Sequence, residues 1–307
     1  MWEVRWEETE MRIVNYGSIN LDHVYAVDHI VQPGETMLAD KKEEFCGGKG
    51  LNQSLAIAKA GCPVDHAGIV GEDGEMLLAA LTACHVNIDH IRHAAGASSH
   101  TVIQVDAHGQ NSIIVFSGEN MRPSEQDLDA ILADYMPGDA IIMQNELFNS
   151  ARMMEKAAAK GLKIIFNPSP ANEALPSYPL DKVDWFILNE IEGEMLTGEK
   201  DAEQILNRLA ARFPNASVVL TLGEKGAFLQ SEGKRIYQSA FPVNAVDTTA
   251  AGDTFTGYFI AGYAFGMPYE RVMKRAALAA SIAVSRAGAA DSVPLKEEVD
   301  RAEDALN

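Results

Sequence analysis

A short stretch near the C-terminal end of the chain, DTTAAGDTF at residues 247–255, places small side chains directly before a carboxylate. Ala250, Ala251 and Gly252 precede Asp253, and an amphipathic pattern begins immediately afterwards. Apolar residues then recur at i, i+3, i+4, i+7 and i+8, which predicts a helix with one face on the core: Phe255, Tyr258, Phe259, Gly262 and Tyr263. The small residues therefore occupy a helix N-terminus, where unpaired backbone N–H groups attract anions.

Two interpretations of Asp253 follow from this placement. A carboxylate beside a bound phosphoryl group can accept the proton of a hydroxyl that attacks phosphorus. Alternatively, Asp253 only complements the positive end of the helix dipole. If this segment is taken alone, the second interpretation is the simpler one.

A second stretch, CGGKGLNQSLAIAKAG at residues 46–61, joins a glycine-rich turn to another helical pattern. It is not a Walker loop, because Gly50 follows Lys49 where Ser or Thr is required. It does not fit the GxGxxG dinucleotide pattern either, which argues against a dehydrogenase. Asn52 lies on the first helical turn beside glycines that allow close contact with a small polyol.

A third stretch, GSINLD at residues 17–22, adds Asn20 and Asp22 directly after a strand pattern. Open α/β sheets bind ligands at the carboxyl ends of their strands. The segment therefore predicts polar groups at the ligand-binding edge of a sheet.

The elements that must position these residues alternate along the chain. Near-continuous apolar runs, typical of strands buried in a parallel sheet, occur at residues 12–17, 140–143, 163–167, 185–188 and 217–222. Helical patterns lie between them, which predicts a mostly parallel sheet covered by helices. Residues 100–116 instead predict a hairpin with one buried and one wet face. With strand-like residues 22–28 and 36–45, it is expected to form a small second sheet, a flap.

Composition narrows the function classes. The 307 residues carry a formal net charge of −19, which argues against nucleic acid and anionic membranes as partners. The three cysteines form no CxxC pair, which favours a reducing cytoplasm over a disulfide framework. No apolar run reaches membrane-spanning length and no signal peptide is recognised, so a cytoplasmic location is expected.

These segments together resemble the ribokinase-like (pfkB-type) carbohydrate kinase family. The resemblance extends from about residue 12 to residue 299 and includes both family signatures, GGKGLNQSLAIAKAG and DTTAAGDTFTGYF. NPSP (167–170), NEIE (189–192) and TLGEKG (221–226) lie between them in the family's order. One departure is Ala250, where the commonest family form has glycine.

The resemblance implies roles for individual residues. Asp253 would be the general base, and the amides of residues 250–253 would form an anion hole. Sugar binding is implied for Asn20, Asp22, Gly48, Lys49, Asn52 and Glu146. ATP and Mg²⁺ are the implied cofactors: Asn189 and Glu192 would contact phosphate and organise Mg²⁺ through water, and Thr221, Gly223, Gly226 and Gly252 would line the nucleotide site. A K⁺ site beside the anion hole is implied for Asp247, Thr249, Ala283, Arg286, Gly288 and Ser292.

The resemblance also implies an organisation and a substrate. We expect one ribokinase-like α/β domain over residues 12–299, a β lid from segments of about 22–45 and 98–117, an N-terminal extension at 1–11, and a homodimer formed through the lid. D-ribose, converted to ribose 5-phosphate, is the favoured substrate. Fructose, 2-keto-3-deoxygluconate or a nucleoside remain alternatives, as does a sugar-binding regulator without catalysis. A regulator would not need Asp253 or the complete run of small residues before it.

Overall fold

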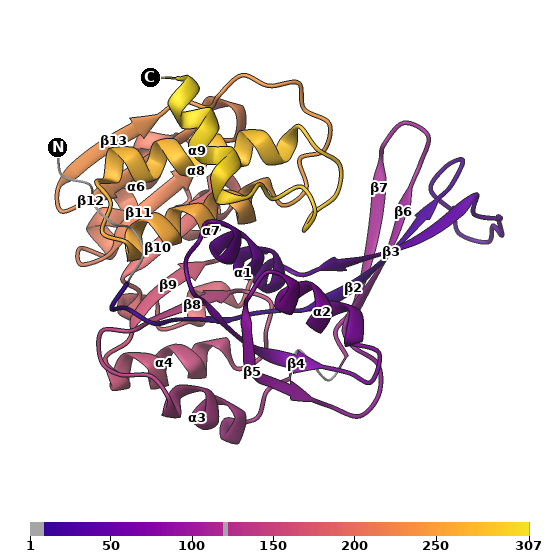
Figure 1. Cartoon of the computed structure of the whole chain (residues 1–307), viewed down its shortest axis with the longest axis horizontal. Helices are drawn as coiled ribbons and strands as arrows, with labels where there is room; N and C mark the ends of the chain where they lie inside the picture. Colours follow the sequence, from indigo (N-terminus) through magenta and orange to yellow (C-terminus); the bar gives the residue numbers. More distant parts are fainter. Residues whose placement is uncertain (1–8, 119–121, 307) are drawn as a thin grey trace.

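A computed structural model describes residues 9–118 and 122–306. It contains a nine-stranded sheet covered by helices and a smaller four-stranded sheet that projects from the body (Figure 1). In spatial order the large sheet consists of β13 (Lys234–Gln238), β12 (Ala227–Ser231), β11 (Ser217–Thr221), β10 (Trp185–Asn189), β9 (Lys163–Asn167), β8 (Ala140–Gln144), β1 (Ile13–Tyr16), β4 (Asp65–Val70) and β5 (Asn87–His93). The expected α/β fold with a separate small sheet is confirmed.

The strand order of the large sheet reverses beside β1. From β11 to β5 all neighbouring strands are parallel, and only β12 and β13 are antiparallel additions at one edge. The chain first runs outward from β1 to β4 and β5, and then returns to β8 on the other side. The gap between the carboxyl ends of β1 and β8 is therefore the topological switch point, where open α/β sheets bind ligands.

Two layers of helices cover the sheet. One face packs against α1 (Lys49–Lys59), α2 (Glu75–Ala83), α7 (Ala251–Ala264), α8 (Tyr269–Val284) and α9 (Lys296–Ala305). The other packs against α3 (Glu125–Ala133), α4 (Ser150–Lys160), α5 (Glu190–Thr197) and α6 (Ala202–Arg212). The strands contribute apolar side chains to the contacts with both helix layers, since β1 and β8 are buried along their whole length.

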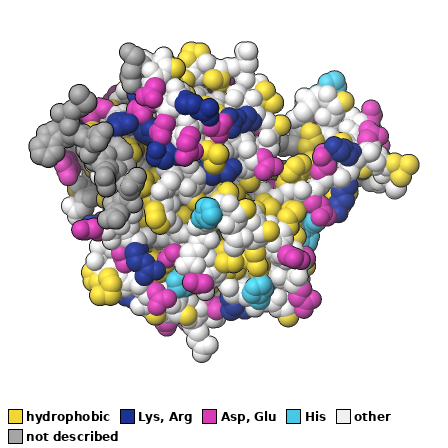
Figure 2. Space-filling view, viewed as in Figure 1, with side chains coloured by type: hydrophobic (Ala, Val, Ile, Leu, Met, Phe, Trp, Pro, Cys, Tyr) yellow, Lys and Arg dark blue, Asp and Glu magenta, His cyan; other side chains and the backbone are white. Residues whose placement is uncertain are grey.

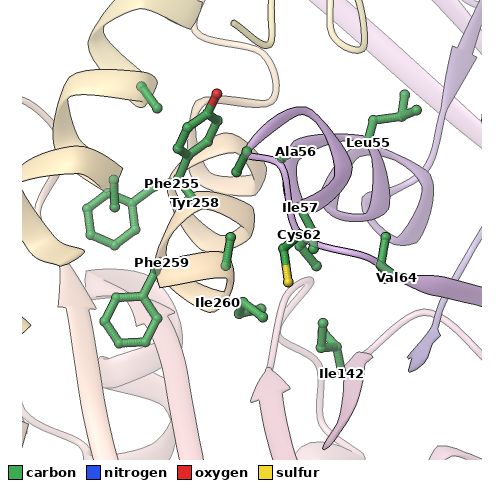
Figure 3. Close-up of a cluster of buried hydrophobic side chains, with 14 of the residues drawn as sticks. Leu55, Ala56, Ile57, Cys62, Val64, Ile142, Phe255, Tyr258, Phe259 and Ile260 are labelled. Atoms are coloured by element: carbon green, nitrogen blue, oxygen red, sulfur yellow. The ribbon is translucent and has the colours of Figure 1, made fainter. Parts of the chain in front are cut away.

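Helices α1 and α7 dock side by side on the first face. A Cβ atom on Gly257 of α7 would lie only 2.3 Å from the Cβ of Ala56 on α1. The absence of a side chain at Gly257 therefore permits the close approach of the two helices. Figure 3 shows Ile57 of α1 and Ile260 of α7 pointing toward the strand that carries Ile142.

The small sheet has the order β3 (Lys41–Gly47), β2 (Asn20–Ala26), β6 (His100–Val105) and β7 (Asn111–Phe116). We call this sheet the lid. It contains the expected segments, although its strand near residues 36–45 begins only at Lys41. The expectation of one buried face on the hairpin is wrong for β7, because Ile113, Ile114, Val115 and Phe116 are 53–63% exposed. β7 is an edge strand, and the lid stands clear of the body of the chain (Figure 2).

The expected N-terminal extension, residues 1–11, lies mostly outside the described residues, which begin at residue 9. Thr9 donates a hydrogen bond from Oγ1 to the carbonyl of Ala264, over 3.0 Å, and Met11 packs against the core. Within the described ranges, no helix has the length and apolar character needed to cross a membrane.

A buried polar group sits between β1, α1 and β4. The Asn15 amide donates from Nδ2 to the Gly50 carbonyl (2.8 Å) and to Ser54 Oγ (2.9 Å). Ser54 Oγ in turn lies 2.8 Å from His66 Nδ1. Burial lowers the pKa of His66 from 6.5 to about 4, so its imidazole is neutral near pH 7.

This burial predicts a pH-dependent stability. Between pH 6.5 and 4 the unfolded chain protonates His66 while the folded chain does not, so the free energy of unfolding falls as the pH falls. From pH 7 to pH 5 this group contributes a loss of about 2 kcal/mol. His66→Gln keeps an acceptor for Ser54 and should lose this contribution. Urea unfolding at both pH values measures the difference, and parallel losses in the two proteins would contradict the prediction.

Candidate active site

Three of the expected site residues, Lys49, Asn52 and Asp253, lie at the N-termini of α1 and α7. Asp253 lies in the first turn of α7 and is 7% exposed. Its Oδ1 accepts a hydrogen bond from Gln53 Nε2 (2.9 Å), and its Oδ2 accepts one from Asn52 Nδ2 (3.2 Å). Asn52 was expected to face a sugar, and it also holds the carboxylate. Gln53 was not singled out from the sequence, although it stands directly after Asn52 on the same helical turn.

Lys49 brings positive charge to this strongly acidic protein. The Asp253 carboxylate, followed by Glu146 and Glu192, outweighs the effect of burial and raises the pKa of the Lys49 ammonium. Lys49 is the first residue of α1, and its charged side chain is suited to attract an anionic ligand to this end of the helix.

Glu146 bridges the switch point. It follows β8, and its Oε2 accepts hydrogen bonds from the Lys49 amide (3.1 Å) and from the Ser18 hydroxyl, which follows β1. Burial raises the pKa of Glu146, and these hydrogen bonds and the Lys49 charge oppose that rise. Ser18 is a further contact that the sequence analysis did not identify.

Asp22 is positioned by the lid. Thr101 on β6 donates from Oγ1 to Asp22 Oδ1 over 2.6 Å. A Cβ atom on Gly47 would lie 2.0 Å from Asp22 Oδ2, so only glycine leaves room for this carboxylate. Burial raises the pKa of Asp22, and the bond from Thr101 partly offsets it. Gly47 and Thr101 were missed because their role depends on strand pairing.

Buried acceptors without partners point to a ligand. Asn20 and Asn52 are 4% and 6% exposed, and the Oδ1 atom of each has no hydrogen-bond partner among the described residues. Buried polar atoms in native proteins are nearly always paired. The unpaired carbonyl oxygens, together with Asp22, match the hydroxyl donors of a polyol. Gly48, the residue before α1, lies against Ser18.

The N-terminus of α7 is open to an anion. Ala250 caps the helix in the left-handed conformation, with φ at 58°, and among the described residues no side chain caps this end. A Cβ on Gly252 would meet nothing within 4 Å. Ala251, the first residue of the helix, has only a methyl side chain, and its amide donates to the Thr248 carbonyl (3.3 Å). The small residues leave the amides of Gly252 and Asp253 open to an anion.

Asn189 and Glu192 form a capping box at the start of α5. Glu192 Oε2 accepts from the Asn189 amide (2.7 Å), and Oε1 accepts from Asn189 Nδ2 (3.0 Å). Each carboxylate oxygen retains a second lone pair, which fits a Mg²⁺ ion that keeps its water ligands. Thr221 ends β11, and Gly223 and Gly226 lie in the turn to β12.

Asp247 joins the two segments of the expected cation site. Its Oδ1 accepts from the Thr249 amide (2.9 Å), and its Oδ2 accepts from the Gly288 amide (3.0 Å). Burial opposes ionisation, but these hydrogen bonds lower the pKa of Asp247 overall. The Ala283 carbonyl, in the last turn of α8, accepts from the Arg286 amide, and buried Ser292 lies in the segment that follows α8. An anionic set made of oxygen atoms fits a hard cation.

Comparisons with known proteins agree with this geometry. The family model described as pfkB family carbohydrate kinase matches residues 11–296. A ribokinase of Haemophilus influenzae is 34% identical over 291 residues, which cover 92% of this chain and 95% of that protein. A deoxyribokinase of Salmonella typhi is 32% identical, covering 94% and 97%.

A solved structure gives the same result in three dimensions. The Arabidopsis thaliana ribokinase complexed with ribose and ATP superimposes with a TM-score of 0.84 at 31% identity, covering 95% of this chain and 98% of that one. The chain therefore belongs to the pfkB family of carbohydrate kinases, phosphotransferases that act on a sugar hydroxyl.

Proposed function

We propose that this kinase transfers the γ-phosphoryl group of ATP to the primary hydroxyl of D-ribose. The observation that carries the proposal is Asp253, a buried carboxylate at an open helix N-terminus beside the unpaired acceptors of Asn20 and Asn52. The similar ribokinase of Arabidopsis thaliana, which was solved with ribose and ATP bound, supports these two substrates. The similar deoxyribokinase leaves 2-deoxyribose as the nearest alternative.

The proposed mechanism assigns one task to each part of the site. Asp253 accepts the proton of the sugar hydroxyl as oxygen attacks phosphorus. The first amides of α7, with Lys49, stabilise the charge on the transferring group. Glu192 with Asn189 would hold Mg²⁺ through water, and the ion would supply positive charge to the phosphates of ATP. ATP would lie along Thr221, Gly223, Gly226 and Gly252.

The lid completes the proposed organisation. We place one kinase domain over residues 12–299, with the segments of about 22–45 and 98–117 as its cover. Asp22 and Thr101 belong to lid strands, so closure brings sugar-binding groups to the site and excludes water as a competing acceptor.

Removing the proposed base tests the catalytic assignment. Asp253→Asn should lower kcat by about 10²- to 10⁴-fold, a typical loss for a missing general base, with little change in sugar or ATP affinity. A coupled ADP-release assay measures turnover, and calorimetric titration measures binding. Near-normal turnover in Asp253→Asn would remove Asp253 from this role.

The Asp247 loop predicts activation by K⁺. The cation would lie between the carbonyl oxygens and the Asp247 carboxylate and would stabilise the anion hole next to it. Na⁺ and Li⁺ should activate less, and Asp247→Ala should lose the response. Rates measured in buffers without other monovalent metal ions decide this, and equal rates with and without K⁺ would eliminate the cation site.

Asp22 predicts the preference for ribose. Thr101 occupies Oδ1, which leaves acceptor positions of the carboxylate for sugar hydroxyls. A sugar that lacks one hydroxyl leaves a buried acceptor unpaired, at a cost of about 1–3 kcal/mol. The ratio of kcat/KM for ribose over 2-deoxyribose should therefore exceed one in the wild type and shrink in Asp22→Ala.

The same assay over other substrates tests the class more broadly. Fructose, 2-keto-3-deoxygluconate and a nucleoside should each give lower kcat/KM values than ribose. A higher kcat/KM for any of them would leave the kinase activity standing and would replace ribose as the proposed substrate.

The exposed strand β7 supports a homodimer formed through the lid. Four consecutive apolar residues, Ile113–Phe116, stand on an edge strand, a surface that a second copy can cover. Ile114→Asp should shift the protein from dimer to monomer in sedimentation velocity. A wild type that is monomeric at micromolar concentration would contradict this assembly.

A further inference from the structure

We propose that Gln144 is a positioning residue for the general base and acts on Asp253 through Gln53. The inference rests on the proposed function of Asp253 and adds a buried chain of side chains behind it. Gln144 ends β8 and is 1% exposed, and its Oε1 atom has no hydrogen-bond partner among the described residues.

The chain of hydrogen bonds is continuous from the carboxylate into the core. Gln53 donates from Nε2 to Asp253 Oδ1 (2.9 Å), and its Oε1 accepts from Gln144 Nε2 (2.8 Å). Gln144 Nε2 also donates to Asn15 Oδ1 over 2.9 Å. Asn15 then leads to Ser54 and His66, the buried polar group described between β1, α1 and β4.

The directions of the hydrogen bonds that link Asn15, Gln144 and Gln53 are determined. The Gly50 carbonyl is only an acceptor, so Asn15 must present its Nδ2 there and its Oδ1 to Gln144. Gln144 must therefore present its amide nitrogen to Asn15 and to Gln53. His66 lies at the end of the chain, with its Nδ1 atom 2.8 Å from Ser54 Oγ.

These hydrogen-bond directions leave one favourable orientation for the side-chain amide of Gln53. With its Oε1 committed to Gln144, its Nε2 faces Asp253; the reversed amide would direct a carbonyl oxygen at a carboxylate. Asn167 supports the same orientation, because its Nδ2 donates to the Ile187 carbonyl (2.7 Å) and its Oδ1 accepts from Gln53 Nε2 (3.3 Å). Gln53 and Asn52 together hold both carboxylate oxygens, which fixes the rotation of the Asp253 carboxylate.

Replacing Gln144 by methionine removes both donors while keeping a side chain of similar length. The Gln53 amide is then free to reverse, and Asp253 loses its fixed orientation. Because small displacements of a reacting group reduce rates strongly, we expect kcat to fall about tenfold and KM for ribose and ATP to change less than about twofold. Ser231→Ala, which removes a partly buried hydrogen bond to Ser217 between β12 and β11, is the matched control and should keep wild-type kcat.

A double-mutant cycle separates positioning from general loss of structure. If Gln144 acts through the Asp253 carboxylate, Gln144→Met should lower the residual single-turnover rate of Asp253→Asn by less than about twofold. Equal factors in the wild-type and Asp253→Asn backgrounds, or an unchanged kcat in Gln144→Met, would overturn the proposal. If Gln144→Met does not fold, Gln53→Met cuts the chain at the next link and is judged by the same cycle.

Different results would reject the general-base role of Asp253 and the positioning role of Gln144. Near-normal turnover in Asp253→Asn would reject the base itself. A strong loss in Asp253→Asn combined with additive effects of Gln144→Met would reject only the positioning chain.

Discussion

The site depends on the close docking of α1 on α7, two helices that are about two hundred residues apart in the sequence. Gly257 lets the helix surfaces approach until Ala56 fills the space of a missing side chain. Only at this separation do the amides of Asn52 and Gln53 reach the Asp253 carboxylate. The sheet below supplies a flat apolar support for both helices, and the switch point between β1 and β8 brings Ser18 and Glu146 to their N-termini. Apolar packing thus determines the geometry of a polar site.

Much of this arrangement could be predicted from the sequence, because its signals are local. Apolar runs identified the strands, and the small residues before Asp253 identified an accessible helix N-terminus. The missed residues act through tertiary contacts. Gly47 matters because strand pairing places Asp22 against it, and Thr101 reaches Asp22 from a strand about eighty residues away. Gln144 carried a signal that was overlooked: a long polar side chain at the end of a fully buried strand must find partners.

The charges of the site are balanced within a strongly acidic protein. Lys49 is surrounded by the carboxylates of Asp253, Glu146 and Glu192, which explains why its ammonium stays charged despite burial. The amide side chains around Asp253 add no net charge. They restrain the carboxylate without neutralising its charge. A second lysine at this place would neutralise it. A nearby cation favours the ionised carboxylate and so makes it a weaker proton acceptor, whereas amide donors orient it without adding a charge.

The exposed strand β7 has a consequence for the protein outside its catalytic cycle. Residues 113–116 form an uncharged, strongly β-prone run with an unpaired backbone edge, the composition from which intermolecular sheets grow. Pairing between such edges becomes more frequent as the concentration of the chain rises, and it favours aggregation wherever no other surface covers the run. We therefore expect the exposed apolar residues of the lid, and not only the packing of the core, to influence expression yield and storage.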